Sequence, residues 1–443
     1  MKRALAAGIL AAAMAGRADS QPVTPTPNPA RTTSIEQLLK DTSVPDAAAP
    51  AAPKAALPVV IDARIGEHDG STRFVVEVSD PVAVRMFTLS SPNRVVLDMP
   101  EVLWRLQNAA QPSGRGVVKS YRYGLFRPGD ARFVIDLNAP VRAAEPMILP
   151  PSGGYGYRVV LDLAPTTQAV FDRTAGWPAD MRAKESAAET VASIAPPKGI
   201  TRAPAPHGKK VIVIDAGHGG IDSGTIGVDG SMEKDLVLDE AIRLGRVLEK
   251  RGYTVHLTRN TDIYIPLRER VNIARGYDAD LFISLHADSN PDSTVQGMSV
   301  YTLSESGSDK EAAALAKKEN QSDIIAGVDL SGDNGPVASI LIDLAQRETM
   351  NRSSHFAQNV VNGLSGATDI LPREPHRSAA FVVLKAPDVP AVLIELGYLS
   401  NPHDSKQMGT DVWRNRVANA IADAVDRQFE NPPSVPVAEK GSQ

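Results

Sequence analysis

Two histidines that closely follow apolar strands are the residues of this chain best placed to do chemistry. His218 lies in the glycine-rich segment Asp215–Gly220, after the β-branched run Val211–Ile214. His286 follows the apolar run Leu281–Ile283 in a similar way. In open α/β sheets, ligands bind at the edge formed by the carboxyl ends of the strands. The sequence therefore predicts that both imidazoles lie at one edge of a sheet, where they can share a metal ion.

Two glutamates add carboxylates to this arrangement. Glu233 stands at the head of an amphipathic helix, and the glycine-rich stretch before it can fold back so that Glu233 and His218 meet at one ion. Glu395 interrupts the apolar strand Ala391–Leu396, where a carboxylate is costly unless it is paired or bound to a metal. A glutamate near zinc in an apolar site has the proton affinity that a general base needs. Two imidazoles and carboxylates at one edge of a sheet suit a zinc hydrolase.

Each of these residues also has an ordinary structural interpretation. His218 alone is compatible with a turn histidine, and His286 with a buried histidine bonded to a backbone carbonyl. Glu233 alone is compatible with a carboxylate that favours the positive end of a helix dipole, and Glu395 with a strand-end residue facing solvent. Asp288 is equally compatible with a residue that orients a histidine and with a turn residue.

The composition narrows the classes of function. The 443 residues carry a formal net charge of −5, 42% hydrophobic residues and only 5% aromatic residues. Because there is no long basic run and no interleaving of aromatic and basic residues, nucleic acid is not the expected partner. The chain contains no cysteine, which excludes disulfides and thiolate ligands, so any metal must be bound by His, Asp and Glu.

The N-terminus is typical of a secretory signal peptide. Met1-Lys2-Arg3 is followed by the apolar run Ala4–Ala15, which is too short to span a bilayer. We expect residues 1–18 to be removed on export, with an uncleaved anchor as the alternative. No later segment approaches the length of a membrane span, so the mature chain is expected to have none.

Two folded domains joined by linkers are expected in the rest of the chain. The first shows short strands with turn residues between them, which predicts an all-β sandwich. The second alternates strands and helices, which predicts a mixed sheet with helices on both faces. The boundaries are a Pro/Ala-rich linker at 19–57, the sandwich at 58–165, a second linker at 166–208, the α/β domain at 209–430 and a tail at 431–443.

Within the α/β domain the clearest element is the helix Glu233–Arg251, which has one apolar stripe and ends at Gly252. In the sandwich, Val141–Leu149 is expected to be one strand. Other expected elements that bear on the results below are helices at Val337–Arg347 and Ser353–Leu364 and a strand at Ala380–Leu384.

The α/β domain resembles the zinc-dependent N-acetylmuramoyl-L-alanine amidases of bacterial cell-wall turnover. The resemblance covers Lys209–Glu430 and depends on five ordered motifs: Val213–Gly220, Glu233-Lys234, Leu257–Arg259, Ser284–Asp288 and Ile394–Asn401. It implies that His218, Glu233 and His286 bind Zn2+ and that Glu395 is the catalytic glutamate. The reaction it implies is hydrolysis of the amide bond between N-acetylmuramic acid and L-alanine in peptidoglycan.

The sandwich resembles the AMIN domain of cell-wall amidases, notably in Phe87–Leu89 followed by Pro92–Asp98. This resemblance implies a module that targets the cell wall. Together the two resemblances imply an enzyme of the periplasm, located at the division septum, that helps to separate daughter cells.

Residues 304–351 form a connection longer than a simple sheet crossing requires, and long insertions near active sites are often lids. Septal amidases with an AMIN domain are similar here, and in that family the insertion can cover the zinc until a periplasmic activator of the LytM type displaces it. Glu319 is the candidate for the carboxylate at the open zinc position. A solvated helix residue is the alternative.

Other functions remain compatible with these residues. One is a different zinc hydrolase of peptidoglycan, either a carboxypeptidase or a deacetylase. Another, from a different class, is a non-catalytic scaffold that binds the cell wall through two modules.

Overall fold

The computed structural model describes residues 57–68, 70–106, 114–127, 129–179, 181, 208–328 and 340–430, without the side chains of 340–346. The predicted signal peptide, nearly all of the first linker, most of the second linker and the tail lie outside the described residues. None of the helices within these ranges is long and apolar enough to cross a membrane.

The N-terminal domain is rich in strands, as predicted, and contains two sheets. One has the order β5-β1-β2-β10-β8, with β9 also paired to β10, and the other has the order β3-β4-β7-β6. Apolar residues of both sheets, among them Phe74 and Phe133, pack into one core. The strands are β1 (Val59–His68), β2 (Ser71–Val78), β3 (Arg85–Leu89), β4 (Arg94–Pro100), β5 (Leu103–Trp104), β6 (Val118–Arg127), β7 (Asp130–Leu137), β8 (Val141–Ala143), β9 (Met147–Leu149) and β10 (Tyr157–Pro165).

This domain differs from the sequence prediction at its C-terminal end. The strand expected at Val141–Leu149 is split into β8 and β9, which pair with different parts of β10. Pro146 lies between them and has no N–H to continue a ladder. In the segment expected to begin the second linker, a short helix, α2 (Gln168–Thr174), inserts Phe171 into the core of the two sheets.

The C-terminal domain is built on one six-stranded sheet with the order β12-β11-β13-β16-β14-β15. The first four strands are parallel, and β14 runs antiparallel to β16. Its strands are β11 (Val211–Ala216), β12 (Thr254–Leu257), β13 (Leu281–His286), β14 (Ser299–Leu303), β15 (His376–Ala379) and β16 (Ala391–Glu395). Its helices are α4 (Glu233–Lys250), α5 (Leu267–Gly276), α6 (Lys310–Glu319), α7 (Ser322–Ile325), α8 (Ile340–Leu364), α9 (Pro402–Met408) and α10 (Asp411–Glu430).

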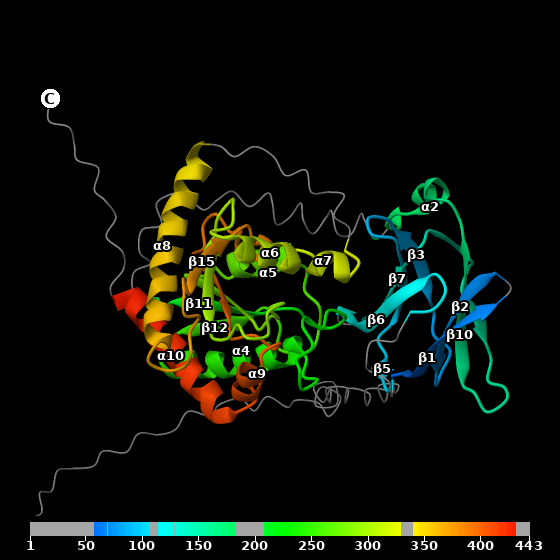
Figure 1. Cartoon of the computed structure of the whole chain (residues 1–443), viewed down its shortest axis with the longest axis horizontal. Helices are drawn as coiled ribbons and strands as arrows, with labels where there is room; N and C mark the ends of the chain where they lie inside the picture. The colour runs from blue at the N-terminus through cyan, green and yellow to red at the C-terminus, as the bar shows by residue number, and fades with distance from the viewer. Residues whose placement is uncertain are drawn as a thin grey trace, which may run out of the picture. The chain divides into compact units, whose positions relative to one another are not determined.

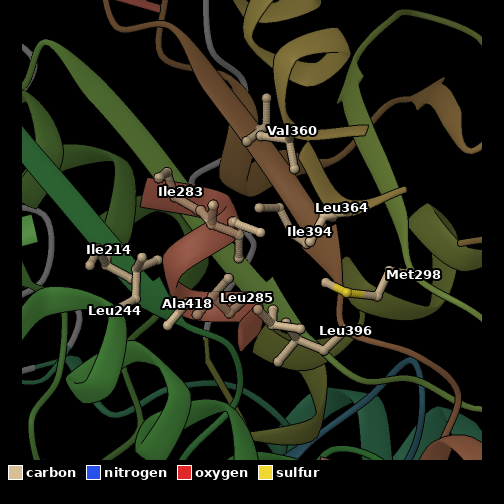
Figure 2. Close-up of a cluster of buried hydrophobic side chains, with 14 of the residues drawn as sticks. Ile214, Leu244, Ile283, Leu285, Met298, Val360, Leu364, Ile394, Leu396 and Ala418 are labelled. Carbon is tan, nitrogen blue, oxygen red and sulfur yellow. The ribbon is translucent and has the colours of Figure 1, made fainter. Parts of the chain in front are cut away.

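Helices cover both faces of this sheet (Figure 1), which confirms the predicted mixed α/β architecture. Alternate residues of a strand point to opposite faces, so Ile214 packs with α4, α8 and α10 while Val213 packs with α5 and α6. Figure 2 shows the first of these cores, where Leu244 of α4 lies beside Ile214 of β11, and Ile394 of β16 lies beside Leu364 of α8. The two cores hold the strands rigidly beneath the edge that carries the candidate site.

The helices predicted at Val337–Arg347 and Ser353–Leu364 are helical over their described residues, but the break expected between them was wrong, because a single helix, α8, runs through it. Ser353 stands at this break and is satisfied inside the helix. Its hydroxyl donates to the carbonyl of Thr349 (2.9 Å) and accepts the N–H of Ala391 at the start of β16 (2.9 Å). Ser353 therefore links α8 to the sheet and does not end the helix.

The strand predicted at Ala380–Leu384 was also wrong. The strand in this region, β15, ends at Ala379, and Val382–Leu384 form a turn of 3-10 helix. The side chain of Asn320 donates to the carbonyl of Ala380 (2.9 Å) and accepts the N–H of Val382 (2.8 Å). These backbone groups are therefore bonded to a side chain that lies just after α6. A local sequence pattern does not reveal such a long-range contact.

Glu240 on α4 is a fully buried carboxylate away from the candidate site. Neither of its oxygens has a hydrogen-bond partner within the described ranges, and Arg243 Nε lies 3.8 Å from Oε2. Burial raises the pKa of Glu240 to about 8. The folded protein therefore holds a proton here that the unfolded chain releases at a lower pH.

The Glu240→Gln variant is expected to be more stable than the wild type at pH 8.5 and to differ little from it at pH 4.5. Because the pKa is raised on folding, the stability that this group contributes is present at acidic pH and is lost as the pH rises towards about 8. The expected difference at pH 8.5 is about 4 kcal/mol, from a pKa that rises from 4.5 to about 8 on folding. Thermal unfolding at both pH values measures it, with Glu249→Gln on the exposed face of α4 as the control. An equal effect at both pH values would contradict the expectation.

Candidate metal centre

Strand register brings the candidate residues of distant segments to one edge of the sheet. β13 lies between β11 and β16, with Leu285 opposite Ala216 and His286 opposite Glu395. His286 and Glu395 are the last residues of their strands, and His218 follows the end of β11 by two residues. The three side chains therefore rise from the carboxyl ends of three adjacent strands, as the sequence predicted.

The ligand atoms of His218, Glu233 and His286 converge. Glu233 Oε1 lies 3.1 Å from His218 Nε2 and 3.3 Å from His286 Nδ1, and one ligand atom from each residue lies within 4.8 Å of the others. A tetrahedral ion with bonds of about 2.0–2.1 Å separates its ligand atoms by roughly 3.3 Å. The spacing therefore fits a single ion.

The hydrogen-bonding state of these atoms also fits a metal. His218 Nε2 and His286 Nδ1 are buried and have no hydrogen-bond partner among the residues that the structure describes. Buried polar atoms are normally bonded, and exceptions require an explanation such as an ion. Two such nitrogens facing one carboxylate oxygen have the chemistry of a zinc site.

Neighbouring groups fix how the ligands point. Asp222 Oδ2 lies 2.9 Å from His218 Nδ1, so that His218 presents Nε2 to the cluster. Glu233 accepts the N–H of Ala287 at Oε1 (2.8 Å) and the N–H of Thr225 at Oε2 (2.9 Å). Asp222 was not predicted to be a site residue; its available signal was its position four residues after His218 in the same glycine-rich loop.

The electrostatics of the cluster favour a cation. Burial disfavours a charge on His218, but the carboxylates of Glu233, Asp222 and Glu319 outweigh burial and hold its pKa well above the usual value. For His286, likewise, the nearby carboxylates outweigh burial and raise the pKa to about 10. The same negative potential stabilises a divalent ion among these side chains.

Two buried arginines hold the loop that carries His218. The backbone of His218 is left-handed, with φ of 58°, a conformation that costs energy in a non-glycine residue. Arg270 donates to the carbonyls of His218 and Ala216 (both 2.8 Å), and Arg259 donates to the carbonyl of Gly217 (2.8 Å). Neither arginine was predicted from the sequence to have a role at the site.

Gly217 makes room for the second histidine. A Cβ at this position would lie 2.5 Å from Cε1 and Nε2 of His286, closer than real contacts allow. The glycine is therefore needed for packing against the imidazole.

Glu395 is fully buried beside the cluster, which excludes its interpretation as a solvent-facing residue. Its Oε2 accepts the N–H of Asp288 (2.9 Å), and its Oε1 has no hydrogen-bond partner within the described part of the chain. Burial raises the pKa of Glu395 to about 8. One oxygen with high proton affinity is thus available to a reacting group.

Glu319, at the end of α6, adds a further carboxylate. Its Oε2 lies 3.1 Å from His286 Nδ1 and 3.4 Å from His218 Nε2. The residue is only 4% exposed, so its interpretation as a solvated helix residue was wrong. Its carboxylate approaches the same point as the carboxylate of Glu233, although the two residues lie far apart in the sequence.

Comparison with known proteins decides the family. Residues 212–427 match the family described as N-acetylmuramoyl-L-alanine amidase, and residues 62–148 match the AMIN domain. The chain is 34% identical over 385 residues to the N-acetylmuramoyl-L-alanine amidase AmiC of Escherichia coli, a match that covers 85% of this chain and 90% of that protein. The chain belongs to the N-acetylmuramoyl-L-alanine amidases.

Further similarities concern other members of this amidase family. AmiC of Neisseria meningitidis is 35% identical over 376 residues, covering 82% of this chain and 88% of that protein. The solved structure of AmiC2 of Nostoc punctiforme is 27% identical and covers 51% of this chain and 99% of its own, with a TM-score of 0.39. The amidase acts on peptidoglycan, and the alternatives of a carboxypeptidase, a deacetylase or a non-catalytic scaffold are set aside.

Proposed function

We propose that this amidase depends on zinc, that it acts in the periplasm during septum splitting and daughter-cell separation, and that its own lid inhibits it. The observation that carries the proposal is the convergence of His218 Nε2, Glu233 Oε1 and His286 Nδ1, with Glu319 Oε2 facing the same point. Three protein ligands and one exchangeable position are the arrangement of a catalytic zinc site.

His218, Glu233 and His286 would hold the zinc. Zinc bound there supplies a Lewis acid for the scissile carbonyl and lowers the pKa of a bound water towards about 7. Glu395 takes a proton from the attacking water through its unbonded Oε1 and passes it to the nitrogen of L-alanine as the amide bond breaks. Asp222 holds the imidazole of His218 in place throughout.

The closed lid is supported by the contacts around α6 and α7. Asp323 accepts from the Tyr264 hydroxyl (2.6 Å) and the N–H of Leu267 (2.9 Å), and the Ser322 hydroxyl donates to Asp222. These bonds hold α6 and α7 in place, with Glu319 in a small pocket that His218 and His286 also line. We infer that a periplasmic activator of the LytM type displaces this segment.

The organisation of the chain follows from the same proposal. Residues 1–18 direct export, 58–165 target the cell wall, and 209–430 carry catalysis, with linkers at 19–57 and 166–208 and a tail at 431–443. The lid lies within 304–351. Its described part includes α6 and α7, and its C-terminal end overlaps the start of α8, whose residues in the catalytic core begin at Phe356.

Purified sacculi treated with the Glu319→Ala variant are expected to release stem peptides that begin with L-alanine and to leave peptide-free glycan. A chelator is expected to stop this release, and added zinc to restore it, because the ligand set consists of imidazole and carboxylate groups. Mass spectrometry of the products measures both effects. Release of free D-alanine or acetate, or full activity in the presence of chelator, would contradict the proposal.

A further inference from the structure

Lys318, the residue before Glu319, makes a second contact between the lid and the site. Its ammonium donates to Asp288 Oδ1 and to the hydroxyl of Thr225 (3.0 Å). The Thr225 hydroxyl in turn donates to Asp288 Oδ1 (2.8 Å). The carboxylate of Asp288 is therefore bound by one charged group, which the lid supplies, and by one hydroxyl of the catalytic domain.

Asp288 is also hydrogen-bonded to the proposed catalytic glutamate. Its N–H donates to Glu395 Oε2 (2.9 Å), and its carbonyl accepts the N–H of Leu399 (2.8 Å), which fixes its backbone. Its role is separate from that of Asp222, which contacts His218. Asp288 thus contacts the Lys318 ammonium through its carboxylate and the catalytic glutamate through its N–H.

Opening of the lid removes the cation from a buried carboxylate. Asp288 is only 2% exposed, and leaving a buried charge without its partner is strongly unfavourable. Once the lid is open, water or another cationic group can take the place of Lys318 beside Asp288. The reaction produces such a group close by, because the nitrogen that Glu395 protonates must lie within hydrogen-bond reach of Glu395, and Asp288 is bonded to Glu395 through its N–H.

We propose that Asp288 and Thr225 form the subsite for the amino group released from L-alanine, and that Lys318 occupies this subsite in the closed enzyme. This inference depends on the proposed roles of Glu395 and the lid. Glu319 and Lys318 then imitate the two charged products side by side: Glu319 stands for the new carboxylate and Lys318 for the new ammonium.

Hydrolysis of the amide needs no reactant other than water. The hydroxyl of water adds to the carbonyl carbon, the C–N bond breaks, and the remaining proton of water passes through Glu395 to the nitrogen. At neutral pH the new acid loses a proton and the amine gains one, since an α-amino group has a pKa of about 7.7–8.0. The products are a carboxylate and an ammonium, and Asp288 stabilises the ammonium as it forms.

Binding of a product analogue tests the inference. The zinc-loaded full chain with Lys318→Ala and Glu319→Ala is titrated by calorimetry with L-alanyl-γ-D-glutamate and with its N-acetylated form. We expect the free amine to bind at least about tenfold more tightly than the acetylated peptide, the factor typical of a hydrogen bond between charged groups. Adding Asp288→Asn is expected to abolish this preference, and Thr225→Val to reduce it.

Two comparisons isolate the role of Lys318. The variant with Glu319→Ala alone keeps Lys318 and is expected to bind the free amine more weakly than the double variant. The variant with Lys317→Ala and Glu319→Ala, which changes the neighbouring exposed lysine, is expected to behave like Glu319→Ala alone.

Equal affinity for the two peptides, or an unchanged preference with a folded Asp288→Asn or Thr225→Val protein, would overturn the inference. The Thr225→Val arm decides the question if the Asp288→Asn protein does not fold. Failure of this subsite leaves the amidase reaction and the lid intact, because chelator sensitivity and activation by Glu319→Ala are measured without the dipeptide.

Discussion

The Glu395→Gln variant is expected to lose amidase activity by about 10²–10⁴-fold, the range typical of removing a general acid–base group. Glutamine keeps the shape of the side chain and can accept the N–H of Asp288, but it cannot take a proton from water. The buried position of Glu395, and the pKa of about 8 that burial gives it, identify it as the group with suitable proton affinity. Loss of turbidity of a peptidoglycan suspension measures the activity.

Two controls accompany this variant. Glu249→Gln changes an exposed glutamate of α4 and is expected to retain wild-type activity. The zinc content of Glu395→Gln is expected to match the wild type, since Glu395 is not among the three converging ligands. Its thermal unfolding is expected at no lower temperature than that of the wild type, since glutamine replaces a carboxyl group whose pKa is raised by burial. A folded, zinc-loaded Glu395→Gln protein with wild-type activity would show that the proposed proton transfer is wrong.

The Glu319→Ala variant is expected to show higher activity than the wild type in the absence of any activator. Glu319 is the lid residue that approaches both histidines, so its removal frees the position that substrate needs. If its contacts favour the closed state by about 2–3 kcal/mol, the activity rises by roughly 30–150-fold. The same turbidity assay measures this, without activator.

The matched control is Glu311→Ala, which removes an exposed glutamate from the first turn of the same helix. Its ion pair with Arg377 is exposed on the Glu311 side and contributes little, so wild-type activity is expected. Point variants are preferable to deleting 304–351, since that deletion would cut α8. Wild-type activity in a folded Glu319→Ala protein would count against autoinhibition.

The site residues that lie at or just after the ends of strands could be predicted from the sequence, because local patterns of apolar residues identify those strands. The apolar runs before His218 and His286 identify buried parallel strands, and a carboxylate in the strand ending at Glu395 is costly without a partner. Strand pairing then brings all three to one edge. The mixed sheet could be predicted for the same reason.

Features that depend on long-range contacts could not be predicted in this way. Arg270, on α5, supports the His218 loop through a hydrogen bond to a residue just after β11. The strand expected at Ala380–Leu384 does not form, because the side chain of Asn320 is bonded to the backbone there. The burial of Glu319 depends on how α6 packs against the sheet and brings Glu319 to His218 and His286. The local periodicity of apolar residues contains no information on these long-range contacts.

Anomalous diffraction at the zinc absorption edge, from crystals of the zinc-loaded protein, shows whether zinc occupies this cluster. We expect one peak per chain, bonded at about 2.0–2.2 Å to His218 Nε2, His286 Nδ1 and a carboxylate oxygen of Glu233. Absence of a peak among these three residues, or a peak held by other side chains, would contradict this expectation.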